Sequence, residues 1–336
     1  MKVAFYEASP SDQAYLREKL SDNHEAVFSP EAISDDNISL AADADVLSTF
    51  IYSRVDERVA RRIPKLKCVA TRSTGFDHID LEFCESAGIA VQNVPRYGEN
   101  TVAEHTFALI LAISRNSHKL YTRMMMASEE ISRVGLIGFD LNGKTLGVVG
   151  AGKIGLHVIR IAKGFGMKVV VYSRSKDDFL SELMGFKYVG FDELLATSDI
   201  ITIHVPLTEH TRHLINKDNI DRIKRGAILI NTARGGVVCN DALTMALDRK
   251  ILVGAGLDAM ESEELVQQEI DPGSAEKFSG LGTGLGLVYR DDVVFTPHIG
   301  YYSVEALQRI LETTILNIHA LAEGKVLNPV KRQARA

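Results

Sequence analysis

Side chains with complementary chemistry follow three apolar runs in the second half of the chain: Arg234, an acidic group at residues 261–264, and His298. An arginine fork can hold a carboxylate through two hydrogen bonds. A histidine can transfer a proton near neutral pH, and a carboxylate beside it would raise its pKa. Because parallel sheets bind ligands at the carboxyl ends of their strands, we expect the three to share one site. A salt bridge across a domain interface for Arg234 and a structural role for His298 are the alternatives.

A glycine motif, G-A-G-K-I-G, starts at Gly150 directly after another apolar run. Gly150 would allow a tight turn, Gly152 would let a pyrophosphate approach the backbone, and Gly155 would let a helix pack closely on the strand. Lys153 and Ile154 would open that helix, whose free N–H groups and partial positive charge favour a phosphate. The pattern predicts dinucleotide binding.

The end of the next apolar run bears on which dinucleotide binds. A carboxylate about 20 residues after the motif would bind the ribose 2′-OH of NAD. Here the run is followed by Ser173, which can hydrogen-bond, and Arg174, which can pair with a 2′-phosphate. These residues favour NADP. NAD stays open as the cofactor, because Asp177 and Asp178 could also reach a ribose.

Apolar, β-branched runs alternate with helical patterns along the whole chain, which predicts an α/β fold with doubly wound parallel sheets. Strands are expected at 3–6, 46–50, 68–71, 90–94, 146–149, 168–172, 200–204, 227–231, 253–257 and 293–295. Helices are expected at 12–20, 55–63, 102–125, 154–165, 241–249 and 304–323. A second glycine-rich run, 280–286, has neither a strand before it nor a helix after it, so we expect a loop there.

The glycine motif lies in the middle of the chain, with strand–helix units before it and a helix after the last strand. A chain that starts in one domain, builds a second and then returns gives this order. We therefore expect a discontinuous substrate domain, 1–98 plus 301–336. A dinucleotide-binding domain, 99–300, would be inserted in it, with the substrate in the cleft between the two.

Composition narrows the class of protein. The 336 residues are 46% hydrophobic and 24% charged, a globular balance that excludes disorder or collagen as a description of the whole chain. The net charge of −6 argues against a nucleic-acid partner, since phosphate binding needs a basic face. No run approaches the ~20 apolar residues that span a bilayer, so we expect a cytoplasmic protein without a membrane partner. Cys68, Cys84 and Cys239 are too scattered for a disulfide framework or a zinc site, and we expect no metal.

Taken together, the motifs resemble those of the D-isomer-specific 2-hydroxyacid dehydrogenases over nearly the whole chain. The similar segments are residues 73–80, 102–105, 204–208 with Thr211, 231–235, 296–300 and 323–330. The resemblance implies a Rossmann cofactor domain inserted in a flavodoxin-like substrate domain, and it implies a homodimer. Dimerisation is expected through the cofactor domain and the helix at 102–125.

The resemblance also assigns catalytic roles. Arg234 and His298 stand where the family has its catalytic Arg and His. Counting five residues from Asp258 makes Glu263 the partner of that His, with Glu261 and Glu264 as the alternative registers.

Further residues are assigned to the ligands. The backbone N–H groups of Thr74 and Gly75 would hold the substrate carboxylate together with Arg234. The residues that the resemblance places around the cofactor, beyond the glycine motif, Ser173 and Arg174, are Val102, His204, Val205, Pro206, Thr211, Thr232, Ala233, Asp258, His298 and Gly300.

Two segments that contain tyrosines, 94–97 and 301–302, resemble the D-lactate dehydrogenase branch of the family more than the phosphoglycerate dehydrogenase branch. Tyr97 and Tyr302 would line the substrate pocket, although packing is an equally good explanation for both. The motifs specify a 2-oxo or 2-hydroxy acid and leave its side chain open, so a glyoxylate or hydroxypyruvate reductase is also consistent with them.

The expected activity is hydride transfer between NAD(P)H and a small 2-oxo acid, or the reverse from a D-2-hydroxy acid. The His298–Glu263 pair would act as the proton donor in one direction and as the proton acceptor in the other. One alternative is a nucleotide-sensing protein like the corepressors that share this fold. A metal-dependent hydrolase built on His210 and His213 is another, but their H-x-x-H spacing lacks the neighbouring Glu of H-E-x-x-H.

Overall fold

The computed structural model describes residues 1–20, 24–126, 132–261, 263 and 285–331. The chain folds into two compact units, Met1–Tyr97 with Ser303–Ala336 and Gly98–Tyr302. It thus leaves the first unit after Tyr97 and returns to it at Ser303. These boundaries lie one and two residues from those expected from the sequence.

The first unit is built on a five-stranded sheet in the order β2-β1-β3-β4-β5, and every pair of neighbouring strands is parallel. This 2-1-3-4-5 order is that of the flavodoxin-like folds. The strands are β1 (Lys2–Phe5), β2 (Glu25–Phe28), β3 (Val46–Ser48), β4 (Cys68–Ala70) and β5 (Ala90–Gln92).

Helices cover both faces of this sheet, because alternate residues of a strand point to opposite faces. Val3 and Phe5 pack in one apolar cluster with Leu16 and Ile315, while Ala4 lies in the cluster of the opposite face. The helices are α1 (Pro10–Lys19), α2 (Glu57–Arg61), α3 (Leu81–Ser86) and α12 (Val304–Ala322), with a 3-10 turn η1 (Ile38–Ala41).

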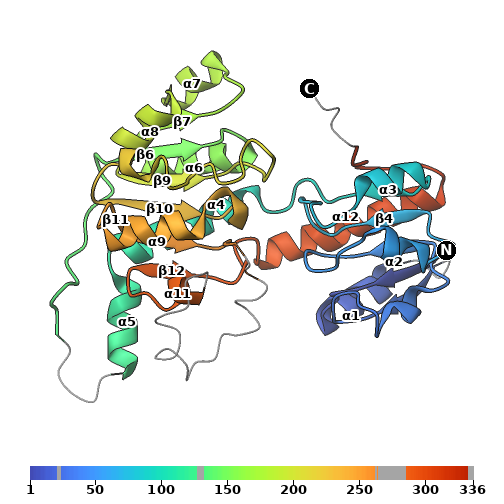
Figure 1. Ribbon diagram of the computed structural model, residues 1–336. Coiled ribbons are helices and arrows are strands. Elements are labelled where there is room, and N and C mark those ends of the chain that lie inside the picture. The colour runs from blue at the N-terminus through green and yellow to red at the C-terminus, as the bar shows by residue number, and fades with distance from the viewer. Residues whose placement is uncertain (21–23, 127–131, 262, 264–284, 332–336) are drawn as a thin grey trace. The chain divides into compact units, whose positions relative to one another are not determined.

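The second unit has a seven-stranded parallel sheet in the order β12-β11-β10-β9-β6-β7-β8 (Figure 1). Six of its strands follow the 3-2-1-4-5-6 order of the dinucleotide-binding fold, and β12 extends the edge. The strands are β6 (Thr145–Val149), β7 (Lys168–Tyr172), β8 (Lys187–Tyr188), β9 (Ile200–Ile203), β10 (Ala227–Asn231), β11 (Leu252–Leu257) and β12 (Val293–Phe295).

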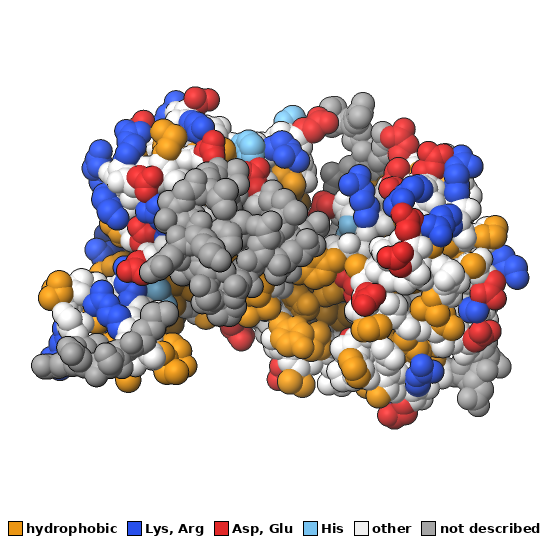
Figure 2. Space-filling model, turned by 60° about the horizontal axis from the view of Figure 1, so that its bottom comes forward, with side chains coloured by type: hydrophobic (Ala, Val, Ile, Leu, Met, Phe, Trp, Pro, Cys, Tyr) orange, Lys and Arg blue, Asp and Glu red, His pale blue; other side chains and the backbone are white. Residues whose placement is uncertain are grey.

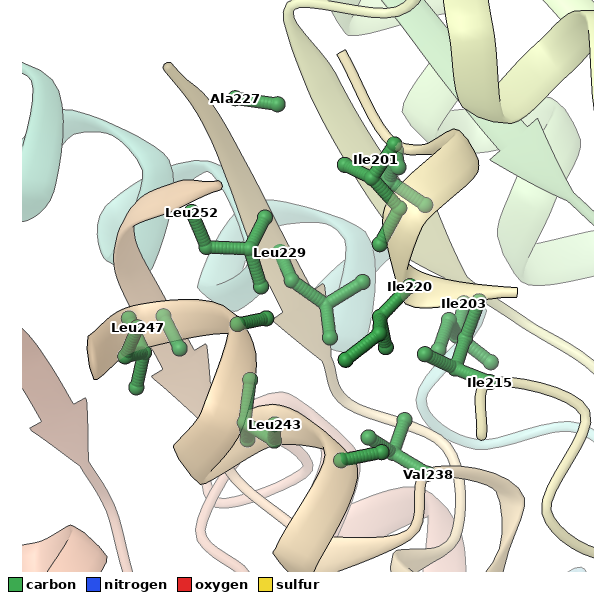
Figure 3. Packing of buried hydrophobic residues seen from close by; sticks show 14 of the residues in the cluster. Ile201, Ile203, Ile215, Ile220, Ala227, Leu229, Val238, Leu243, Leu247 and Leu252 are labelled. Atoms are coloured by element: carbon green, nitrogen blue, oxygen red, sulfur yellow. The ribbon is translucent and has the colours of Figure 1, made fainter. Parts of the chain in front are cut away.

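The helices of the second unit are α4 (Glu99–Ser114), α5 (Ser117–Met126), α6 (Lys153–Gly164), α7 (Asp178–Met184), α8 (Phe191–Thr197), α9 (Asn240–Asp248) and α11 (Leu285–Val288). Two 3-10 turns complete the unit: η2 (Ile220–Arg222) lies between β9 and β10, and η3 (Gly235–Val237) lies between β10 and α9. All five residues of β10 are buried. Its Leu229 packs in the cluster on the α9 face (Figure 3), and Ile230 packs in the cluster with α4 and α6. Because both faces of the sheet are filled, we expect Leu229→Ala to lower the free energy of unfolding by about 2–5 kcal/mol.

The α/β class with two doubly wound parallel sheets, predicted from the alternating runs, is confirmed. The expected single helix at 102–125 is wrong. It is two helices, α4 and α5, because Asn116 adopts a left-handed backbone with φ +50° that interrupts the helical hydrogen bonds. The strand β2, the two-residue strand β8 and the short helices α3, α7 and α8 were not anticipated.

Most of the second glycine-rich run, 280–284, lies outside the described residues, so the loop expected there stays a prediction. The short helix α11 begins at Leu285, within the expected range of that loop.

Among the residues that the structure describes, no helix is long and apolar enough to cross a membrane. Figure 2 shows one face of the molecule, on which Lys and Arg side chains are interspersed with Asp and Glu.

Candidate active site

The glycine motif forms the turn between β6 and α6 and is open on one side. Gly150 has φ +101°, and a Cβ there would lie 2.7 Å from the carbonyl oxygen of His204. At Gly155 a Cβ would clash with the carbonyl of Gly150, which explains the close packing of α6 on β6. Around Gly152, the N-cap of α6, a Cβ would meet no atom within 4 Å. This open space beside a helix N-terminus is suited to a phosphate.

The segment after β7 carries the cation Arg174 and two carboxylates, Asp177 and Asp178, of which Asp177 caps a helix. Ser173 is half-buried and Arg174 is exposed. Asp177 is the N-cap of α7, where its Oδ1 accepts a hydrogen bond of 2.9 Å from the N–H of Leu180. Because that carboxylate stabilises the helix, it is less available to a ribose than the sequence suggested.

The segment after β9 holds three of the predicted cofactor residues in fixed positions. The ring of His204 contacts Thr202 Oγ1 at 2.9 Å through Nε2, and burial lowers its pKa to about 3. The hydroxyl of Thr211 donates to the carbonyl of Pro206 at 2.6 Å. Val205 packs against the core of the unit. The segment therefore presents a neutral imidazole next to the glycine turn.

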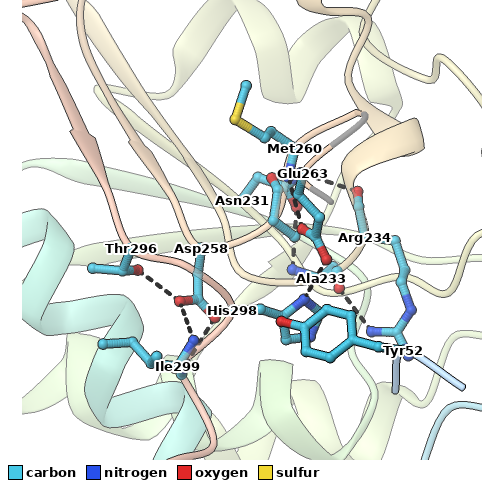
Figure 4. A network of polar contacts seen from close by, with 12 residues as sticks. Tyr52, Asn231, Ala233, Arg234, Asp258, Met260, Glu263, Thr296, His298 and Ile299 are labelled. Carbon is cyan, nitrogen blue, oxygen red and sulfur yellow. Dashed lines mark hydrogen bonds and ion pairs between the residues drawn. The ribbon is translucent and has the colours of Figure 1, made fainter. Parts of the chain in front are cut away.

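The end of β10 is organised by Asn231, whose side chain had no role assigned from the sequence. Its buried side-chain amide donates to the carbonyls of Arg234 at 3.0 Å and Ala259 at 3.1 Å, and its Oδ1 accepts from Ala233 N at 3.1 Å. One buried amide thus joins the turn that carries Arg234 to the segment after β11 (Figure 4). Thr232 is also buried.

The carboxylate of Asp258, at the end of β11, holds the loop that contains His298. Oδ1 accepts from Thr296 Oγ1 at 2.6 Å and from Ile299 N at 2.9 Å, and Oδ2 accepts from Gly300 N at 2.9 Å. Burial alone would raise the pKa of Asp258, but hydrogen bonds from His105 and Thr296 outweigh it and lower that pKa. Asp258 therefore acts as an ionised anchor for the loop. The contact to a nicotinamide carboxamide that the resemblance implied stays a prediction.

His298 and Glu263 form a pair. His298 Nδ1 lies 2.8 Å from Glu263 Oε1, and the two side chains are 18% and 20% exposed. Oε2 of Glu263 accepts from the N–H of Met260 at 3.3 Å, which orients the carboxylate. Nε2 is then the ring nitrogen left to exchange a proton with a ligand. The pair is therefore half-buried and still accessible from one side, as a proton donor must be.

The distances also separate the alternative registers. Glu261 lies 2.6 Å from His213 Nε2, and not beside His298. Glu264 lies outside the described residues. The geometry thus selects Glu263 over Glu261 as the carboxylate that orients His298.

The remaining predicted substrate residues are divided between the two units. Thr74 and Gly75 follow β4, where Thr74 Oγ1 donates to the carbonyl of Val94 at 2.8 Å. Within the described ranges, the N–H groups of Thr74 and Gly75 donate no backbone hydrogen bond, as an anion-binding loop requires. Tyr97 belongs to the same unit, and its carbonyl accepts from Arg309 Nε at 2.8 Å.

Tyr302 ends the second unit. The residue is 65% exposed, and its ring packs edge-on against Tyr301, with ring centroids 5.9 Å apart. Tyr302 is therefore largely exposed, and the contact with Tyr301 also gives its ring a packing role.

Helix α4 contributes two residues that sequence reasoning missed. His105 Nε2 lies 2.9 Å from Thr296 Oγ1 and 3.3 Å from Asp258 Oδ1. Thr106 Oγ1 lies 3.0 Å from Thr232 Oγ1 and also donates to the carbonyl of Val102 at 2.8 Å. The helical period places both on the face toward the sheet, but no local pattern names their partners.

Comparison with known proteins agrees with this geometry. The family model "D-isomer specific 2-hydroxyacid dehydrogenase, NAD binding domain" matches residues 107–300. A 2-hydroxyacid dehydrogenase homolog of Haemophilus influenzae is 34% identical over 97% of this chain and 98% of its own. A glyoxylate reductase of Thermococcus litoralis is 37% identical over 84% of this chain and 82% of its own.

A crystal structure of D-lactate dehydrogenase from Aquifex aeolicus, complexed with NAD and lactic acid, superposes with a TM-score of 0.84. The two sequences are 37% identical, and the match covers 96% of each chain. The sheet order, the family model and these relatives converge on the resemblance that the motifs indicated. This chain belongs to the D-isomer-specific 2-hydroxyacid dehydrogenase family.

Proposed function

We propose that this protein reduces a small 2-oxo acid to the D-2-hydroxy acid, and catalyses the reverse oxidation, with His298 exchanging the proton. The observation that carries the proposal is the His298–Glu263 pair at the carboxyl ends of the sheet that bears the glycine turn. Family membership supports an oxidoreductase that uses a nicotinamide cofactor. The roles of individual residues are our inference.

Different residues of the chain would supply proton transfer and substrate binding. His298 would donate a proton from Nε2 to the substrate oxygen, while the Glu263 carboxylate at Nδ1 stabilises the protonated ring and fixes its orientation. Arg234 would bind the carboxylate and stabilise the negative charge that develops on the keto oxygen. The backbone N–H groups of Thr74 and Gly75 would also take part in binding the carboxylate.

The residues present fit a dinucleotide. The open space at Gly152 and the N-terminus of α6 would hold the pyrophosphate, and the segment 204–211 and Thr232 would contact the rest. When bound, the nicotinamide supplies the hydride.

We propose that NADP(H) is preferred over NAD(H). The support is the exposed Arg174 after β7, together with the commitment of the Asp177 carboxylate to the cap of α7. A guanidinium would pair with the 2′-phosphate of NADP, whereas NAD recognition ordinarily uses a free carboxylate at this place.

We also propose that the protein is cytoplasmic and forms a homodimer through the second unit. Helix α5 exposes Tyr121, Met124 and Met125, which are 66%, 55% and 70% accessible. Apolar side chains gathered on one helix are typical of a surface that a second copy covers. The molar mass in solution tests this state.

The central experiment is a panel of glyoxylate, pyruvate and hydroxypyruvate, each reduced with NADH and with NADPH. We expect turnover of at least one acid and a higher kcat/KM with NADPH. Absence of turnover with every acid, despite cofactor binding, would favour a nucleotide-sensing protein and overturn the proposal. Equal or better rates with NADH would overturn the cofactor preference alone.

A further inference from the structure

A second cluster of reactive side chains lies in the second unit and does not include the His298–Glu263 pair. A ring nitrogen of His213, Sγ of Cys239 and a carboxylate oxygen of Glu261 all lie within 4.8 Å of one another. The three residues are distant in sequence and come from the segment after β9, the N-cap of α9 and the segment after β11. All three are half-buried.

The backbone that carries these side chains is cross-connected by hydrogen bonds. The N–H of His213 donates to the carbonyl of Gly236 at 2.8 Å, and the N–H of Cys239 donates to the carbonyl of Ile215 at 3.0 Å. Glu261 Oε2 accepts from the N–H of Asn240 at 3.2 Å. The three side chains therefore project from positions that are already held together before any ligand binds.

The donor set is one nitrogen, one sulfur and one oxygen, a combination that zinc accepts with tetrahedral geometry. Zinc bonds of about 2.0–2.3 Å place tetrahedral ligand atoms about 3.3–3.8 Å apart, so rotations of the side-chain ends would bring this set into range. The Glu261–His213 contact of 2.6 Å would widen as the ion takes the place of the shared proton. Asn240 N–H would stay on the second carboxylate oxygen and orient it, as groups around zinc ligands commonly do.

We propose that His213, Cys239 and Glu261 bind one zinc ion, with a water molecule as the fourth ligand. The His213 side chain is 41% exposed and that of Glu261 is 25% exposed, so an ion and a water can reach the site from solvent. Such an ion would tie the segment after β9 and the start of α9 to the loop that leads to Glu263. The H-x-x-H hypothesis paired His213 with His210, whereas this site uses partners that only the fold brings near.

The test is a titration of the full-length, chelator-treated protein with Co²⁺, followed by displacement with Zn²⁺. We expect one equivalent of Co²⁺ to produce a thiolate-to-cobalt charge-transfer band that Zn²⁺ removes and Mg²⁺ does not. Cys239→Ser should lose the band. His213→Gln should bind at least about tenfold more weakly, since even groups that only support a ligand contribute on that order.

Matched controls separate this site from other thiols and imidazoles. Cys84→Ala and His210→Ala should keep the band, since burial raises the pKa of the Cys84 thiol to about 11 and His210 is exposed and outside the cluster. An unchanged circular dichroism spectrum and unfolding midpoint verify that each variant is folded.

A band that survives Cys239→Ser, or the absence of stoichiometric binding to the wild-type protein, would overturn the proposal. The second outcome would leave His213–Glu261 as a hydrogen-bonded pair. Because the readout is spectroscopic, it is independent of whether the proposed dehydrogenase reaction is correct.

Discussion

The two units place charged groups at the same end of similar parallel sheets but use them in opposite ways. In the first unit, Arg72 after β4 is 2% exposed and donates to the carbonyls of Tyr6 and Glu7 at 2.6 and 2.7 Å. In the second unit, His298 and Glu263 are half-buried and directed at each other. The first unit uses its buried charge to hold the backbone in place, whereas the second has a partly exposed His–Glu pair, for which we propose a role in proton transfer.

The carboxylates show both uses, and the second unit contains one of each. Glu7 accepts hydrogen bonds from the N–H groups of Phe50, Tyr52 and Ser53, at 2.8–3.0 Å, and so holds the loop after β3. In the second unit, Asp258 holds a loop in the same manner, while Glu263, five residues later, orients the histidine. A loop is held rigidly when its backbone N–H groups are satisfied by a carboxylate, whereas the proton transfer that we propose for His298 needs a titratable group within reach of the substrate.

The largest expected effect is a loss of enzymatic activity when the partly exposed histidine of the second unit is removed. His298→Ala should lower kcat by about 10²–10⁴-fold, because proton donation is lost, while the dissociation constant of the cofactor changes little. Steady-state kinetics and NADPH fluorescence measure the two quantities. His210→Ala is the control, since that residue is exposed. Near-normal turnover of the His298 variant would remove this residue from the reaction.

The buried charge of the first unit should act on stability instead. Arg72→Met would leave the carbonyls of Tyr6 and Glu7 without a donor, and we expect a loss of about 3 kcal/mol in the free energy of unfolding. Urea denaturation measures it. Arg58→Met, which removes a guanidinium that is 67% exposed and paired with Asp35, should cost less than about 1 kcal/mol. Equal losses in the two variants would contradict the distinction between a buried and a surface cation.

Arg174 tests whether an exposed cation of the second unit selects the cofactor. Arg174→Ala should lower kcat/KM for NADPH about tenfold, the equivalent of one charge-assisted hydrogen bond, and leave the value for NADH unchanged. Lys176→Ala is the matched control on the same segment. An equal loss of kcat/KM with both cofactors would mean that Arg174 does not bind the 2′-phosphate.

Unlike the partly exposed His298, His204 of the second unit has a buried ring. Burial lowers its pKa to about 3 and keeps the ring neutral. In the unfolded chain the ring takes up a proton near pH 6.5, so the folded state loses stability as pH falls below that value. The residue as a whole is only half-buried, which moderates the effect, and we expect about 1 kcal/mol between pH 7 and pH 5. His204→Gln should flatten this pH dependence of unfolding, whereas His210→Gln should not. An unchanged slope in the His204 variant would show that its imidazole gains a proton in the folded state.

The local sequence predicted several features because their causes are local. Buried parallel strands require continuous β-branched apolar residues, so β7, β10 and β12 were predicted with their observed bounds. The glycine turn was predictable because only glycine satisfies the φ of +101° at Gly150 next to the carbonyl of His204. The strand β2 was missed although Ala26, Val27 and Phe28 form a short apolar run, and the structure shows that this run pairs in parallel with β1.

The sequence by itself determined the order of strands and helices along the chain, the nucleotide turn and the set of polar residues at the strand ends. The tertiary structure decided which of them meet: that Glu263 and not Glu261 orients His298, that Asp258 holds the His298 loop, and that Glu261 joins His213 beside Cys239. Backbone propensities and residue sizes act over a few neighbours and can be read from the chain. Hydrogen bonds between segments depend on sheet order and loop register, which only the packed fold specifies.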